Sequence, residues 1–220
     1  MFVTVYGDSI LKGVLFENGK YTVSHDWEEK LCERFGLCVT NRSRFGSTLP
    51  KAMARIEKDS ATEAEGEYAL LEFGGNDCDF DWAAVAEAPE GEHTCKTPPA
   101  LFVECYHRAI RLLRNSGRIP VLSSLPPINA ELYLNFLCRN GLSRENIVRW
   151  LGDVQRIYRW QENYSQMVEQ VAREEHTPLI DLRRPFLQDE RSPETLLCAD
   201  GIHPSREGQG LIYNTLCAVL

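Results

Sequence analysis

The sequence predicts an α/β fold in which a mostly parallel β-sheet lies between two layers of helices. Short segments rich in β-branched and aromatic residues alternate about five times with amphipathic segments of helical period. The stretches between successive strands are long enough to hold a helix, which is typical of parallel pairing. With 43% hydrophobic residues in a chain of 220, residues 1–220 are expected to form one domain with a core of its own.

Five segments are expected to be the strands of this sheet. Each is short and largely apolar, and Gly, Pro, Asn or Asp follows within a few residues: residues 2–6, 38–40, 68–73, 119–123 and 178–182. At Gly7-Asp8-Ser9 we expect a tight turn and the start of a helix.

Helices are expected where apolar residues recur at helical spacing. In residues 24–35 they recur at positions 27, 31 and 35, Ser24 can cap the amino end, and Gly36 can end the helix. The other expected helices are residues 48–59, 99–115, 153–175 and 205–219, with shorter helices within 129–151.

Two segments are longer than a sheet with covering helices requires. Residues 78–98 are expected to form an irregular loop, long enough to be a lid or a binding loop. Residues 129–164 are expected to form a helical insert that carries six aromatic side chains. Both follow strands at the same end of the sheet and could wall a binding site. Alternatively, most of the aromatic side chains pack the insert against the sheet.

The charge and the cysteines exclude several classes of protein. With 24 Lys and Arg against 32 Asp and Glu, the net charge of −8 is unsuited to binding the phosphate backbone of nucleic acids. No apolar run approaches the ~18 residues that a membrane span requires. The eight cysteines are scattered without a Cys-x-x-Cys pair, so we expect reduced, mostly buried thiols. Because no targeting segment is visible at the amino end, we expect a cytoplasmic protein.

Polar and glycine residues follow four of the expected strands. Ligands of parallel sheets bind outside the carboxyl ends of the strands, so these residues are expected to converge. They are Gly7-Asp8-Ser9 after the first strand, Gly46 after the second, Gly74-Gly75-Asn76-Asp77 after the third and Asp200-Gly201-Ile202-His203 after the fifth.

Three of these residues suit nucleophilic catalysis. A serine in a turn at the edge of the sheet, such as Ser9, exposes both its hydroxyl and its N–H group. A separation of three residues lets the Asp200 carboxylate reach the near ring nitrogen of His203, which leaves the far nitrogen free to take a proton from Ser9. Taken singly, Ser9 also fits a helix cap, and Asp200 and His203 fit solvated or structural roles.

Two further residues can supply hydrogen-bond donors to a developing oxyanion. Gly46 allows close approach to its backbone N–H group, and Asn76 offers a side-chain amide. Taken singly, they also fit a turn glycine and an Asx turn. The carboxylates of Asp8 and Asp77 are expected to accept hydrogen bonds from loop N–H groups rather than to take part in chemistry.

Together, these motifs resemble the conserved blocks of the SGNH hydrolases, also called the GDSL esterase/lipase superfamily. The resemblance spans residues 7–204, with Ile10 where the family name has Leu. It implies a three-layer α/β/α sandwich around a five-stranded parallel sheet, the flavodoxin-like arrangement of that superfamily, to which the insert at about 129–164 is added.

The resemblance also implies the roles of the site residues. Ser9 is expected to be the nucleophile, His203 the base and Asp200 the acid that orients it. Ser9, Gly46 and Asn76 are expected to form the oxyanion hole, without a metal or another cofactor.

We therefore expect a serine esterase that hydrolyses carboxylic esters through an acyl-enzyme. The resemblance favours short, acetyl-type acyl groups on a carbohydrate or another small molecule, and leaves open a lysophospholipase or thioesterase. A non-catalytic binding module on the same scaffold is the alternative from a different class, and it predicts the loss of a catalytic group. The absence of a Gly-x-Ser-x-Gly motif argues against an α/β-hydrolase. The candidates for contacting the substrate are Phe45, Asp77 and Trp82.

Overall fold

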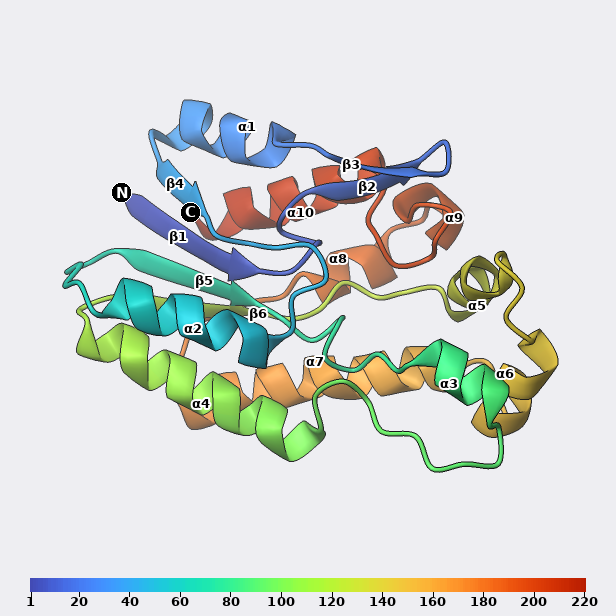
Figure 1. Cartoon of the computed structure of the whole chain (residues 1–220). Helices are drawn as coiled ribbons and strands as arrows, with labels where there is room; N and C mark the ends of the chain where they lie inside the picture. The colour runs from blue at the N-terminus through green and yellow to red at the C-terminus, as the bar shows by residue number, and fades with distance from the viewer.

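A five-stranded parallel sheet forms the middle layer of an α/β/α sandwich in the computed structural model, which describes residues 1–220 (Figure 1). The strand order is β4-β1-β5-β6-β7, and every pairing is parallel. The predicted fold class is therefore confirmed. The strands are β1 (Phe2–Gly7), β4 (Cys38–Asn41), β5 (Tyr68–Glu72), β6 (Ile119–Ser123) and β7 (Leu179–Ile180).

The last strand is shorter than predicted, because the side chain of Asp181 ends it. Asp181 Oδ1 accepts hydrogen bonds from the backbone N–H groups of Arg183 and Arg184 and from the hydroxyl of Ser124. These bonds turn the backbone away from the sheet. Only two residues of the predicted 178–182 remain in the strand.

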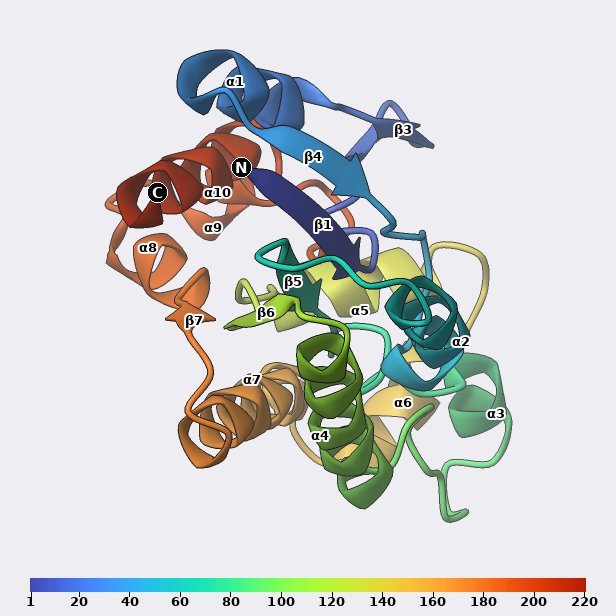
Figure 2. The same ribbon diagram turned by 90° about the vertical axis from the view of Figure 1, so that its left-hand side faces the viewer.

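Helices cover both faces of the sheet (Figure 2). One layer contains α2 (Leu49–Ser60), α4 (Pro99–Asn115) and α7 (Arg156–Glu174). The other contains α1 (Asp26–Phe35), α8 (Arg183–Gln188), α9 (Pro193–Leu196) and α10 (Arg206–Val219). The short helices α8 and α9 were not predicted, whereas the longer helices lie within a few residues of their predicted bounds.

Alternate residues of the central strands enter two separate cores. Tyr6 and Leu71 pack into the core beneath α2, α4 and α7. Val5 and Leu70, their neighbours along the strands, pack into the core beneath α1, α8 and α10. Successive side chains of a strand point to opposite faces, so a sheet buried on both sides needs apolar residues at nearly every position.

A third apolar cluster lies beyond the carboxyl ends of the strands. It joins α3 (Trp82–Glu87), α5 (Ala130–Cys138) and α6 (Arg144–Leu151) to the start of α7 (Figure 1). The prediction of an irregular loop over residues 78–98 is wrong in part, because α3 forms within it. The Asp81 carboxylate caps this helix by accepting from the Ala84 N–H group.

The turn after β1 leads into a hairpin rather than a helix. Residues 8–13 form a turn, and β2 (Val14–Glu17) and β3 (Lys20–Val23) pair antiparallel after it. The predicted helix start at Ser9 is therefore wrong. Asn18 and Gly19, both with positive φ, make the two-residue turn. An Asn-Gly pair between apolar runs is a strong hairpin signal, although the predicted elements did not include this hairpin.

The eight cysteines are all unpaired, and four of them are buried. No helix combines the length and the apolar composition needed to cross a bilayer.

Candidate active site

A continuous hydrogen-bonded chain joins Ser9, His203 and Asp200. Ser9 Oγ lies 2.9 Å from His203 Nε2, and His203 Nδ1 lies 2.6 Å from Asp200 Oδ2. The other carboxylate oxygen of Asp200 accepts from the backbone N–H groups of Ile202 and His203. Because the carboxylate accepts at Nδ1, that nitrogen carries the proton and Nε2 is free to accept from the serine hydroxyl. All three predicted residues are buried and brought together.

Long-range contacts fix the loop that holds Asp200 and His203. Cys198 Sγ accepts from the Phe16 N–H group of the hairpin, and the Cys198 N–H group donates to the carbonyl of His203. On the other side, the Asn129 N–H group, at the start of α5, donates to the Gly201 carbonyl at 2.8 Å. The hairpin and the insert therefore hold the imidazole in place from two directions.

The three residues predicted to form the oxyanion hole all line the cavity beside the serine hydroxyl: Ser9, Gly46 and Asn76. Neither the Ser9 N–H nor the Gly46 N–H donates to another backbone group. Gly46 has a positive φ of 67°, a conformation that glycine adopts without strain. Such an arrangement can stabilise negative charge that develops on a bound carbonyl oxygen.

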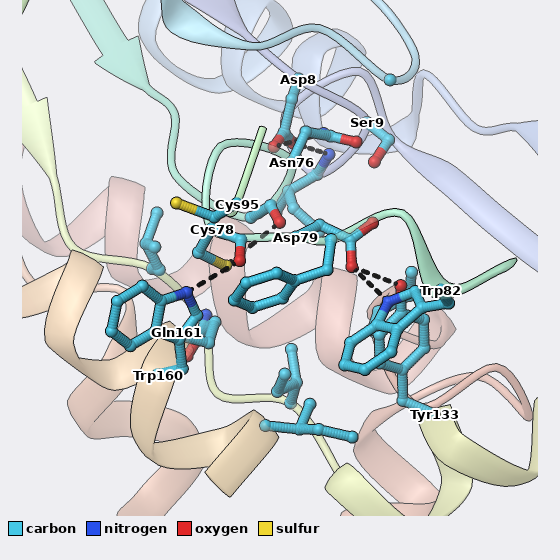
Figure 3. Close-up of a pocket in the computed structure, with 18 of the residues that line it drawn as sticks. Asp8, Ser9, Asn76, Cys78, Asp79, Trp82, Cys95, Tyr133, Trp160 and Gln161 are labelled. Carbon is cyan, nitrogen blue, oxygen red and sulfur yellow. Dashed lines mark hydrogen bonds between the residues drawn. The ribbon is translucent and has the colours of Figure 1, made fainter. Parts of the chain in front are cut away.

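The carboxylate of Asp8 orients the Asn76 amide. Asp8 Oδ2 accepts from Asn76 Nδ2 at 3.0 Å, and Oδ1 accepts from the Ile10 N–H group at 2.9 Å (Figure 3). Burial raises the pKa of Asp8. Burial, and then the charge of Asp8, raise the pKa of Glu72 well above its usual range. Burial and the neighbouring charge of Asp8 both favour the protonated form of Glu72.

The cavity beside Ser9 has a volume of about 530 Å³ and is lined largely by apolar side chains. Such a volume lies within the range of small-molecule sites. Part of this lining is a cluster of aromatic rings that contact one another, formed by Phe80, Trp82, Trp150 and Trp160. Trp82 and Trp160 lie on the side of the cavity away from Ser9 (Figure 3). Part of the predicted wall, the insert and the segment 78–98, is thus in place, while other insert aromatics such as Tyr164 are core residues.

Asp79 fastens the segment 78–98 to the insert. Its Oδ1 accepts from Trp82 Nε1 at 2.7 Å and from the Tyr133 hydroxyl at 2.9 Å (Figure 3). Its Oδ2 accepts from Lys96 Nζ. A further bond runs from Trp160 Nε1 of α7 to the backbone carbonyl of Cys78. The segment that follows β5 is therefore hydrogen-bonded both to α5 of the insert and to α7.

Of the three residues predicted to contact the substrate, two line the cavity. They are Phe45, whose ring stacks on that of His203, and Trp82. Asp77 does not line it: the side chain is fully buried, and its carboxylate accepts from the Leu49 N–H group at the start of α2. Asp77 thus caps a helix, in line with the expectation that it bonds a loop N–H group.

Comparison with known proteins identifies the family of the chain and supports the same fold. Residues 5–211 match the model of the GDSL-like lipase/acylhydrolase family. The chain belongs to this family.

Solved structures of bacterial hydrolases share the fold at low sequence identity. A lipase/acylhydrolase from Enterococcus faecalis is 18% identical, with a TM-score of 0.63 over 99% of this chain and 94% of the other. A member of the lipolytic G-D-S-L family from Veillonella parvula is 16% identical, with a TM-score of 0.67 over 100% and 97%. A catalytic mutant of an acetylxylan esterase from Geobacillus stearothermophilus is 16% identical, with a TM-score of 0.67 over 99% and 92%. The curated proteins contain no match.

Two residues near the site of this GDSL-like hydrolase were not predicted. Tyr21 comes from the hairpin, and its ring centroid lies 5.4 Å from that of His203. The Asn-Gly turn could have located this hairpin, although not its position over the imidazole. Glu72 lies at the end of an apolar strand, and a carboxyl group in such a run was the signal in the sequence for a buried ionisable group.

We expect Gly201→Ala to disturb the site through the insert. Gly201 has a φ of +73°, and a Cβ there would lie 2.6 Å from the Tyr133 nitrogen and 2.8 Å from the Asn129 carbonyl oxygen. Backbone strain and the clash together should lower the free energy of unfolding by about 2–4 kcal/mol. Displacement of the loop should lower kcat for p-nitrophenyl acetate by at least about tenfold. Urea denaturation and steady-state kinetics measure the two effects.

Gly141→Ala is the matched control, because Gly141 also has a positive φ but no atom lies within 4 Å of the added Cβ. This variant should lower the free energy of unfolding only by the cost of the backbone strain, and its kcat should equal that of the wild type. Equal kinetics in Gly201→Ala and the wild type would contradict the role of this contact.

Asp77→Asn should change how stability depends on pH. Burial raises the pKa of Asp77 from 3.8 to about 7. The folded state therefore holds a proton that the unfolded chain has released, and this group lowers stability as the pH rises from 4 to 7. The asparagine keeps an acceptor for the Leu49 N–H group and does not titrate. Its free energy of unfolding, relative to the wild type, should rise from pH 4 to 7 and level off above.

Urea denaturation at a series of pH values measures this difference, and Glu33→Gln, at an exposed site, is the control. Parallel curves for Asp77→Asn and the wild type would show that Asp77 is ionised in both states throughout.

Proposed function

We propose that this protein is a serine esterase in which Ser9, His203 and Asp200 form a catalytic triad. The observation that carries the proposal is the buried chain from Ser9 Oγ to His203 to Asp200, with distances of 2.9 and 2.6 Å, at the edge of a cavity. The family of the chain, whose members include lipases and acylhydrolases, agrees with a hydrolase.

In the proposed reaction, the Ser9 hydroxyl attacks the carbonyl carbon of the ester as His203 Nε2 takes its proton. Asp200 holds the ring orientation and stabilises the imidazolium that forms. The charge that develops on the carbonyl oxygen is stabilised by the N–H groups of Ser9 and Gly46 and by the Asn76 amide.

The tetrahedral intermediate then collapses, and the C–O bond to the alcohol breaks. His203 returns the proton to the departing alcohol oxygen, which leaves an acyl group on Ser9. Water, activated by His203, attacks the acyl carbon. The same steps release the carboxylic acid and restore the serine hydroxyl.

For the substrate, we propose a short acyl group on a carbohydrate or another small molecule. The aromatic faces of Trp150 and Trp160, with polar groups of Gln161 and His93 beside them, suit a ring that has apolar faces and hydroxyl edges. The acetylxylan esterase is one structural neighbour of this kind, and its likeness of 16% identity supports the shared fold.

Ser9→Ala should remove nearly all esterase activity without unfolding the protein. Loss of the nucleophile should lower kcat for p-nitrophenyl acetate by at least about 10³-fold. A fluorophosphonate probe followed by mass spectrometry should label Ser9 in the wild type and in the exposed-serine control Ser192→Ala. Absence of labelling in folded wild-type protein would support a non-catalytic binding module instead.

A series of acyl chain lengths tests the substrate class. Acetyl esters should show a kcat/KM at least about tenfold above octanoyl esters, because the apolar wall is assigned to the alcohol group and not to the acyl chain. Trp150→Ala should raise KM for an acetylated sugar, whereas Phe35→Ala, on α1 and outside the cavity, should not. A preference for octanoyl esters would favour a lysophospholipase or thioesterase.

A further inference from the structure

A second hollow lies behind the two turns that hold Ser9 and Gly46. Its volume is about 470 Å³, none of its lining residues is hydrophobic, and it shares none of them with the cavity beside Ser9. Five of its side chains are cationic and one is a carboxylate: Lys12, Arg42, Arg44, Arg55, Lys58 and Asp59. In a chain with a net charge of −8, this is a local concentration of positive charge.

The carboxylate in this hollow does not neutralise the cations. Asp59 Oδ2 accepts from the Tyr6 hydroxyl at 3.1 Å and pairs with Arg42 at 3.5 Å. Of the other cations, neither the two lysines nor Arg44 and Arg55 forms an ion pair. Four cationic side chains that form no ion pair therefore line one polar hollow, where their combined positive charge favours the binding of an anion.

Arg55 is the fixed member of this group. Its Nη2 donates to Ser47 Oγ at 3.3 Å, which holds the guanidinium in place on α2. Its Nε atom is shielded from solvent and donates to no group of the chain. A buried donor without a partner carries a cost that a bound acceptor would remove. Burial and the nearby Arg44 also lower the pKa of the Arg55 guanidinium.

The backbone holds the hollow against the end of β1. The Arg42 N–H group donates to the Val5 carbonyl and the Arg44 N–H group to the Gly7 carbonyl. In Figure 1 the segment from β4 to α2 passes the end of β1 on its way to the helix. The cations therefore lie on a framework bonded to the sheet, although their side-chain ends reach solvent.

We propose that this hollow binds a phosphate group, either free or carried by a larger molecule. Guanidinium groups present several N–H donors in a plane and match the oxygens of a phosphate, and lysines add charge without geometric restriction. A dianion is favoured over a carboxylate because four cations lack a partner. The proposal does not depend on the esterase reaction, because the two hollows have separate linings.

The test is binding of inorganic phosphate to the wild-type protein at constant ionic strength. Phosphate should raise the midpoint of thermal unfolding in a saturable way, whereas sodium chloride at equal ionic strength should not. Isothermal titration calorimetry gives the affinity. Arg44→Gln and Lys58→Gln replace exposed side chains, so both variants should fold, and each should weaken binding by about tenfold.

Lys51→Gln, on the exposed face of the same helix α2, and Arg111→Gln, on α4, are the matched controls and should bind phosphate as the wild type does. A parallel titration with glucose 6-phosphate distinguishes a site for free phosphate from a site for a phosphate group carried by a larger molecule. Tighter binding of the sugar phosphate indicates a carried phosphate, and equal or weaker binding indicates the free ion. Equal effects of phosphate and chloride, or unchanged affinity in the Arg44→Gln, Lys58→Gln double variant, would overturn the proposal.

Discussion

The parallel sheet reverses its direction of winding between β1 and β5, and the placement of the site depends on this reversal. The chain runs from β1 outward to β4 on one side and then returns to β5 on the other side of β1. The turns after these neighbouring strands diverge above the sheet and leave a crevice. Ser9 follows β1 and Asn76 follows β5, so the strand order alone brings the hydroxyl and the amide to this crevice.

Several buried carboxyl groups gather at the same end of the sheet, and each is accommodated differently. The carboxylates of Asp200 and Asp8 each accept hydrogen bonds from backbone N–H groups and from one polar side chain. The carboxylate of Asp77 accepts a hydrogen bond from the Leu49 N–H group at the start of α2. At Glu72, burial and then the charge of Asp8 raise the pKa well above its usual range. An unpaired buried charge is costly, so hydrogen bonds or protonation must offset burial for each group. Of these groups, Asp8 sets the orientation of Asn76 and Asp200 sets that of His203.

The sequence predicted the parts of the site that local patterns encode. Gly7-Asp8-Ser9 and Asn76 each follow the end of an apolar strand, and parallel pairing brings such ends together. Helices α8 and α9 separate the Asp200–His203 segment from β7, so the contacts of its loop with the hairpin and α5 position this segment. The Asn-Gly turn marks the hairpin, but its position over His203 could not be predicted, because Phe16 is held there by a contact with Cys198, 182 residues away in sequence. Helix α3 was missed because six residues are too few to show a helical period against their acidic surroundings.

The residues that carry the chemistry and those that shape the cavity come from different parts of the fold. Ser9, Asn76 and His203 lie on turns next to the sheet, whereas the apolar wall comes from α3, the insert and α7. The two parts meet at few polar points, chiefly the Asn129–Gly201 bond and the bonds of Asp79. Substitutions on the inner face of the wall can therefore alter which alcohol group fits, while the distance between Ser9 and His203 stays fixed by the sheet, the hairpin and the loop after α9.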